Sequence, residues 1–246
     1  MFERILERLS VSKYKYNFIL KGGLLLSSIM GISSRTTMDM DATIKGININ
    51  EEEFYKILNE ILSIDINDNI KFIIKNSKPI KEDDDYGGFK FNILAIFDNL
   101  KVNLSIDIAT GDIITPKEIE YSYKMMFEDK NLTIMTYNTE TLIAEKFQTI
   151  ISRNILNSRM KDYYDLYYLI KNEAFSKNTL TQAIKNTFNK RDTKLESTSI
   201  NKILSDIENS DFIKDLWNAY SKKYPYANNI DFKTIINYIK TINSYL

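Results

Sequence analysis

The pattern of hydrophobic and polar residues changes about midway along this chain of 246 residues. In the first part, segments with apolar residues every three or four positions stand between segments that alternate apolar and polar. Helices and strands are therefore both expected there. The helical spacing covers 2–9, 22–30 and 51–62, and the strand patterns cover 17–20, 38–45, 70–75, 89–97 and 101–108. Gly31 is suited to end the second helix, and Asp98-Asn99 to turn between the last two strands.

From about Thr139 onward the spacing of apolar residues is mainly helical. The helices expected there cover 139–156, 159–171, 180–188, 200–207, 212–222 and 232–242. Gly and Pro are scarce, with 7 and 3 residues, and no segment has the composition of a linker. We therefore predict an α/β (α+β) domain with a mixed sheet over residues 1–137, followed by an all-helical domain over residues 138–246.

The amino-acid composition limits the chemistry that this protein can perform. The chain contains no Cys and no His. A zinc site is almost excluded, because zinc sites use Cys or His ligands, and Ser-His-Asp or Cys-His catalysis is excluded outright. A bound metal is therefore expected to be a hard cation such as Mg²⁺ held by carboxylates. A general base would have to be Asp, Glu, Lys or Tyr.

Charge and hydropathy favour an ordinary globular protein over a nucleic-acid-coating or membrane protein. The 33 Lys and Arg residues balance the 33 Asp and Glu residues. Proteins that coat nucleic acid by charge alone are usually basic, although a neutral enzyme can still have a local basic groove. The first ten residues lack the apolar run of a signal peptide, and no segment has the length and hydropathy of a membrane span. We expect a cytoplasmic protein without membrane contact.

The strand predicted over 38–45 carries two carboxylates in alternating positions. Asp39 and Asp41 then share one face of the strand, while Met38 and Met40 point into the core. Two acids on one face repel each other unless a positive charge lies between them, and a divalent cation is the natural partner. The alternative is that both acids belong to a solvated strand face.

A glycine pair precedes these acids. Gly22 and Gly23 open the second predicted helix, about sixteen residues before Asp39. Glycine lets the backbone approach a phosphate closely, and the N-terminus of a helix favours an anion. Metal ions held by the acids would neutralise a triphosphate and activate an attacking oxygen. This combination is typical of nucleotidyltransferases and favours a metal site over a solvated face.

A third carboxylate follows on the strand predicted over 101–108. Val102, Leu104, Ile106 and Ile108 would form its apolar face, and Asn103, Ser105 and Asp107 its polar face. Asp107 could complete a metal site with Asp39 and Asp41. Alternatively, it belongs to a polar, exposed face that ends in a turn at Gly111-Asp112.

Several spaced motifs resemble the AbiEii/AbiGii nucleotidyltransferase toxins of abortive-infection and toxin–antitoxin systems. They are Lys21-Gly-Gly-Leu, Arg35-x-Thr37-x-Asp39-x-Asp41, Ala144-Glu-Lys146-Phe, Arg153, and Arg159-x-Lys-Asp162-x-x-Asp165-Leu. The resemblance implies a nucleotidyltransferase fold with a helical C-terminal domain, and Mg²⁺ with a nucleoside triphosphate. It also implies nucleotide transfer to RNA, in some members to the tRNA 3′ acceptor end, and a cognate antitoxin.

The resemblance also assigns roles to individual residues. Gly23 matches the phosphate-side glycine, Asp39 and Asp41 the metal-binding pair, Lys146 the helix-borne lysine, and Asp162 the acidic residue that follows it. The last four are expected to be catalytic. The residues expected to bind the nucleotide are Gly22, Gly23, Ser27, Arg35 and Lys146, although Arg35 could instead orient Asp39 or Asp41. Many nucleotidyltransferases have Ser or Thr directly after the glycine, where this chain has Leu24, and Ser27 and Ser28 follow one helical turn later.

Some of these residues also have ordinary structural explanations. Lys146 could be a solvated helix lysine, and Asp162 an acid favoured near a helix N-terminus. The tyrosines of the Tyr163–Tyr168 run are expected to fill the core for the most part, although aromatic rings can stack on bases. Two other functions stay open: a nucleotidyltransferase that modifies a small molecule such as an antibiotic, and a nucleotide-binding module without catalysis.

Overall fold

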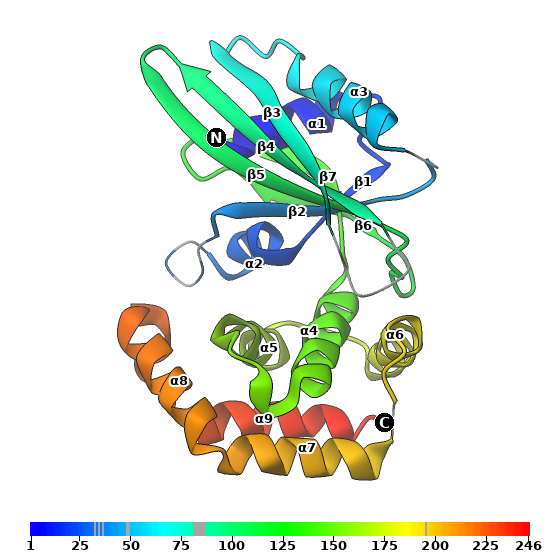
Figure 1. Ribbon diagram of the computed structural model, residues 1–246, viewed down its shortest axis with the longest axis vertical. Helices are drawn as coiled ribbons and strands as arrows, with labels where there is room; N and C mark the ends of the chain where they lie inside the picture. Colours follow the sequence, from blue (N-terminus) through cyan, green and yellow to red (C-terminus); the bar gives the residue numbers. More distant parts are fainter. Residues whose placement is uncertain (32, 34, 36, 48–49, 81–86, 195) are drawn as a thin grey trace. The chain divides into compact units, whose positions relative to one another are not determined.

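The computed structural model describes residues 1–31, 33, 35, 37–47, 50–80, 87–194 and 196–246. The chain forms two compact units (Figure 1). The first unit consists of Met1–Asp112 and Glu118–Tyr137, and the second of Ile113–Lys117 and Asn138–Leu246. A short piece of the chain before the last two strands of the first unit therefore packs with the second unit.

The first unit is built on a seven-stranded sheet with the order β3-β4-β5-β2-β1-β7-β6. Its strands are β1 (Phe18–Lys21), β2 (Asp39–Ile44), β3 (Ile70–Ile80), β4 (Gly88–Phe97), β5 (Leu100–Thr110), β6 (Ile119–Lys124) and β7 (Asn131–Thr136). The β2–β5 and β1–β7 pairs are parallel, and the other pairs are antiparallel. The predicted mixed sheet is thus confirmed.

Three helices accompany the sheet: α1 (Phe2–Val11), α2 (Gly22–Met30) and α3 (Glu51–Leu62). One face of the sheet is apolar, and α3 covers it. The centre of the Phe54 ring on α3 lies 5.4 Å from the ring centre of Phe89 and 6.4 Å from that of Phe91. α1 reaches the same face through Arg8, whose guanidinium lies 4.9 Å from the Phe72 ring centre. The opposite face carries the polar residues of β2, β4 and β5.

The second unit is helical, as predicted. It contains α4 (Thr139–Arg153), η1 (Asn154–Leu156), α5 (Met160–Asn172), α6 (Lys177–Lys190), α7 (Ser197–Asn209), α8 (Asp211–Lys223), η2 (Pro225–Ala227) and α9 (Phe232–Asn243). α4 packs against α5 and α6, and α9 packs against α5 and α7. Tyr163, Tyr164 and Tyr167 are buried, which confirms that most of the tyrosines in this run fill the core. Among the described helices, none has the length and apolar character needed to cross a membrane.

Three differences between the structure and the predicted elements concern the first unit and its connection to α5. Strands β6 and β7 were not expected; β7 lies between β1 and β6, and β6 forms the edge of the sheet. Met38 was expected in the core but is 87% exposed, since β2 begins only at Asp39. The helix expected over 139–156 ends at Arg153, where Asn154 adopts a positive φ of 49° and a 3₁₀ turn follows.

Candidate active site

Strand pairing collects polar residues from β2, β5 and β4 on one face of the sheet. Residues paired across neighbouring strands share a face, so the pairing defines two rows. One row contains Asp41, Asp107 and Lys90, and the other contains Asp39, Ser105 and Asn92. The three aspartates predicted from the sequence therefore lie on one face of adjacent strands. They are Asp39, Asp41 and Asp107.

Asp41 lies directly against the start of α2. A Cβ atom placed on Gly22 would be 2.0 Å from Asp41 Oδ2, and Gly22 has a φ of +65°. The backbone N–H of Gly23 donates to the same oxygen over 3.3 Å. Only glycine permits this approach and this conformation, and the positive end of the helix stabilises the carboxylate. The absence of a side chain at Gly22 thus lets the Asp41 carboxylate lie against the start of α2.

The loop before β2 packs on the second glycine. A Cβ atom on Gly23 would be 2.6 Å from Thr37 Oγ1 and 3.5 Å from Arg35 Nη2. Arg35 is only 4% exposed, so its charge is fixed beside the helix start. The hydroxyl of Ser27 donates to the Gly23 carbonyl over 2.9 Å. Four of the predicted nucleotide-binding residues, namely Gly22, Gly23, Ser27 and Arg35, are therefore neighbours.

Asp107 has a cation partner that sequence reasoning did not find. Lys90 Nζ lies 3.2 Å from Asp107 Oδ1 and 3.3 Å from Oδ2. Burial raises the pKa of Asp107 above its ordinary value; Lys90 opposes this effect, and the charges of Asp41 and Asp39 add to it. The sequence places Lys90 at the edge of a strand pattern, but only the register of β4 on β5 shows which residue it faces.

Lys21 stands opposite Asp41 in the β1–β2 pair but directs its ammonium elsewhere. Its Nζ lies 2.5 Å from Asp112 Oδ2, which also accepts the Tyr137 hydroxyl over 2.8 Å. Among the described residues, no cation forms an ion pair with Asp39 or Asp41. These two acids leave a region of negative charge on the sheet face beside α2.

The acids fit a hard metal ion that is shared with a ligand. Within the described parts of the chain, no three His, Cys, Asp or Glu side chains are grouped so that they could hold a metal by themselves. Mg²⁺ usually binds one or two carboxylates and completes its octahedral shell with water and substrate phosphates. Asp39 is exposed and Asp41 is half-buried, so both can present oxygen ligands to such an ion.

The other two predicted catalytic residues lie together in the second unit. Lys146 Nζ on α4 is 2.6 Å from Asp162 Oδ1 and 2.9 Å from Asp165 Oδ2 on α5. Arg159 Nε lies 2.8 Å from Asp162 Oδ2, although its N–H is not directed at that oxygen. Asp162 and Asp165 are 1% and 0% exposed. We call these four residues the buried charge network.

The buried charge network is balanced, with two cations and two anions. Burial alone would lower the pKa of Lys146, but the carboxylates of Asp165 and Asp162 outweigh this and raise it above the ordinary value. Lys146 is therefore a permanent positive charge and cannot serve as a general base near neutral pH. Arg159 is the member that reaches solvent, with 44% of its side chain exposed.

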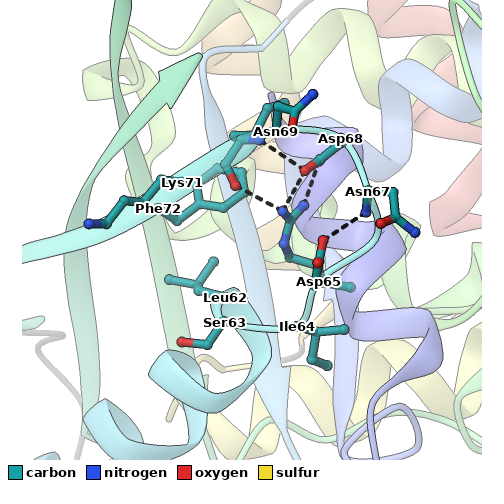
Figure 2. Close-up of a pocket in the computed structure, with 11 residues that line it drawn as sticks. Leu62, Ser63, Ile64, Asp65, Asn67, Asp68, Asn69, Lys71 and Phe72 are labelled. Carbon is teal, nitrogen blue, oxygen red and sulfur yellow. Dashed lines mark hydrogen bonds and ion pairs between the residues drawn. The ribbon is translucent and has the colours of Figure 1, made fainter. Parts of the chain in front are cut away.

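One cavity of the first unit, about 580 Å³, lies beside the α3–β3 loop, whose residues Asp65, Asn67, Asp68 and Asn69 line it (Figure 2). There Arg8 binds both carboxylate oxygens of Asp68 over 2.7 Å. Another cavity, about 440 Å³, lies beside α2. Its lining comes from four segments: Met1, Phe2 and Glu3; Leu24, Ser27, Ser28 and Gly31; Arg35 and Thr37; and Tyr123, Lys124, Met125, Met126 and Phe127. We call this second space the α2 cavity.

A mixed sheet with an acid pair beside a glycine-opened helix, followed by a helical unit, defines a nucleotidyltransferase-like protein. The sequence profile of the family described as "Nucleotidyl transferase AbiEii toxin, Type IV TA system" matches residues 4–238, and the chain belongs to this family. The predicted resemblance is thus confirmed. Family membership supports a transferase with a nucleotide substrate and a cognate antitoxin.

The fold of JHP933, a solved structure, is shared with this chain at low sequence identity. JHP933 from Helicobacter pylori aligns over 99% of this chain and 87% of its own, with 18% identity and a TM-score of 0.50. An antigenic nucleotidyltransferase-like protein from Paracoccidioides brasiliensis aligns over 81% of this chain and 93% of its own, with 13% identity and a TM-score of 0.45. No protein with a curated description matches the sequence.

Proposed function

We propose that this chain is a Mg²⁺-dependent toxin that transfers a nucleotide from a nucleoside triphosphate to RNA, with the 3′ acceptor end of tRNA as its target. The observation that carries the proposal is the juxtaposition of Asp39 and Asp41 with the glycine-opened start of α2. A cytoplasmic location and neutralisation by an antitoxin accord with this activity and with the family.

In the proposed reaction, a hydroxyl oxygen of the RNA bonds to the α-phosphorus of the triphosphate and its proton passes to water. The bond between the α-phosphorus and the oxygen that bridges it to the β-phosphorus breaks, and pyrophosphate leaves. Asp39 and Asp41 would hold Mg²⁺, with Asp107 as a neighbouring acid. The bound ion would neutralise charge on the phosphates and lower the pKa of the attacking hydroxyl. Such reactions depend mainly on positioning and charge.

The residues around the acids have separate tasks in this proposal. Gly22 and Gly23 let phosphate oxygens approach the N-terminus of α2, where backbone N–H groups favour anions. Arg35, which is buried beside Gly23, supplies a fixed positive charge on that side. Lys90 partly neutralises Asp107, so Asp39 and Asp41 carry most of the free negative charge.

The buried charge network supports the reaction from the second unit. The family resemblance assigns catalytic positions to Lys146 and Asp162. Because Lys146 contacts two carboxylates, we propose that it holds α4 and α5 together and directs Asp162 toward Arg159. Arg159, with 44% of its side chain exposed, would then contact a phosphate of the RNA.

The test is incubation of the purified chain with Mg²⁺, each labelled triphosphate and total tRNA. Label should appear on tRNA, and mass spectrometry of the tRNA should locate the added nucleotide. Asp41→Ala should transfer no label and should relieve the growth arrest that expression of the chain alone is expected to cause. Label on an antibiotic instead of tRNA would contradict the RNA target. Binding of nucleotide without transfer to any acceptor would contradict the enzymatic function.

A further inference from the structure

Arg35 lines the α2 cavity and belongs to the proposed phosphate site, but the rest of the cavity has no role in the proposed chemistry. We propose that it binds the base and ribose of the incoming nucleoside triphosphate, while the phosphates lie at the start of α2. This inference rests on the proposed function, because it locates the remaining part of the same substrate. All residues that line the cavity belong to the first unit.

The cavity begins where the proposed phosphate site ends. Arg35 and Thr37 line it, and both approach the Cβ position of Gly23. From there it follows one face of α2, where Leu24, Ser28 and Gly31 are spaced at helical intervals. A ligand anchored by its phosphates at Gly23 would therefore extend along this face. A buried cation at one end and an apolar wall beyond it match the polarity of a nucleotide.

The far wall is apolar and aromatic. The β6–β7 loop contributes Met126, 44% exposed, and Phe127, 86% exposed. A large aromatic side chain left in water next to a cavity is suited to stack on a flat ring, and bases present such a face irrespective of their identity. Phe2, from the start of α1, lines the same space.

The loop that carries Phe127 is held in place by hydrogen bonds. Glu3 Oε1 accepts the backbone N–H of Met126 over 2.8 Å and the Tyr123 hydroxyl over 3.4 Å. The N–H of Met125 donates to the Lys130 carbonyl over 2.9 Å, which closes the turn. The cavity is therefore largely formed before any ligand enters, as is usual for sites that bind small molecules. Its volume of about 440 Å³ also falls within their range.

The experiment compares nucleotides with inorganic tripolyphosphate, which has the phosphates but no base or ribose. Binding to the full chain is measured by calorimetry in Mg²⁺. The variants are Ser28→Trp, which fills the cavity, and Phe127→Ala, which removes the stacking ring. Ser63→Trp is the matched control, because Ser63 is exposed at the end of α3 and does not line the α2 cavity.

The wild type should bind at least one nucleoside triphosphate about tenfold more tightly than tripolyphosphate, given the usual strength of base stacking. Ser28→Trp should lower the affinity for the nucleoside triphosphate to that for tripolyphosphate, and the affinity for tripolyphosphate should not change. Phe127→Ala should weaken only the nucleoside triphosphate, by about tenfold, and Ser63→Trp should behave as the wild type. If Ser28→Trp does not fold, Phe127→Ala still tests the proposal, because its ring is exposed.

Failure of this inference and failure of the proposed function give different results. If Asp41→Ala abolishes nucleotide binding while Ser28→Trp and Phe127→Ala bind normally, the base lies elsewhere and only the inference is overturned. If both variants weaken binding of tRNA but not of nucleotides, RNA occupies the cavity and the inference is again overturned. If neither nucleotides nor tripolyphosphate bind the wild type, the proposed function fails as well.

Discussion

Both units place aspartates near basic side chains, but they do so under opposite conditions. In the first unit Asp39 is exposed and Asp41 half-buried, and no cation among the described residues pairs with either. In the second unit Asp162 and Asp165 are fully buried and share the ammonium of Lys146. A charge removed from water must be paired, whereas a charge that keeps its hydration can remain unpaired.

This difference separates residues that can accept a ligand from residues that hold the fold. The open acids can bind a cation without first losing a partner. The ion pairs of the buried charge network would have to be broken before Lys146 could bind a substrate. Mutations in the two places should therefore affect different quantities: catalysis in the first unit, and stability together with catalysis in the second.

The largest effect is expected for Asp41→Asn. Loss of one of the carboxylates proposed to bind the metal should lower nucleotide transfer by about 10³-fold or more. The melting temperature should change little, because removal of the repulsion between the acids offsets loss of the interaction between the carboxylate and the start of α2. The transfer of labelled nucleotide measures the activity, and thermal unfolding measures the melting temperature. Asp98→Asn, at an exposed hairpin position, is the control. A variant as active as the wild type would show that Asp41 holds no metal.

Asp165→Asn should act on stability. It leaves Lys146 buried with one carboxylate, so the free energy of unfolding should fall by about 3–4 kcal/mol. Urea denaturation of the wild type and of Asp165→Asn at neutral pH measures this loss of stability. Asp206→Asn, at an exposed position on α7, should change the free energy of unfolding by less than about 0.5 kcal/mol. Equal stability of Asp165→Asn and the wild type would show that the buried charge network does not hold α4 to α5.

Gly22→Ala tests how closely the fold positions Asp41. The added Cβ would displace the carboxylate, and transfer should fall by about 10²-fold, as expected for a displacement near 1 Å. Gly46→Ala is the matched control: its φ is +77°, but its Cβ would come no closer than 3.6 Å to Asn17. Both variants should lose about 1–2 kcal/mol of stability through backbone strain, but only Gly22→Ala should lose activity. Equal transfer rates would contradict the role of Gly22.

The smallest effect concerns a pair in the first unit that resembles the network of the second. Arg8 is buried and binds Asp68 through two hydrogen bonds, and the pKa of Asp68 is below its ordinary value because the stabilising contact with Arg8 and the N–H of Ile70 outweigh burial. At pH 7, Asp68→Asn should lower the free energy of unfolding by about 2 kcal/mol without changing nucleotide transfer.

The stability that Asp68 contributes is also expected to depend on pH. Because the folded-state pKa of Asp68 is lowered, its contribution to stability is complete above the unfolded-state value of about 3.9. The contribution is lost as the pH falls through the folded-state pKa, where the carboxylate becomes protonated. The stability difference between wild type and Asp68→Asn should therefore shrink below about pH 4. A difference that stays constant down to pH 2 would contradict the ion pair.

Local patterns in the sequence were sufficient to predict much of the fold. Most helices and the five strands of the 1–110 region follow from the spacing of apolar residues, because burying one face of an element requires that spacing. Strands β6 and β7 were missed, although each is as long as β2, and Met38 was misplaced because β2 begins one residue later. The sequence also limited the possible chemistry: without His and Cys, a bound metal would need carboxylate ligands, and Asp39 and Asp41 are the pair predicted for it.

The surroundings of those residues were decided only by the tertiary structure. Lys90 faces Asp107 because of the register between two strands, and a shift by one residue would turn it to the other face. Lys146 is held by Asp162 and Asp165 because α4 and α5 pack together. The α2 cavity is enclosed by four segments that are distant along the chain. Such contacts depend on packing between elements, which the periodicity within a single element does not contain.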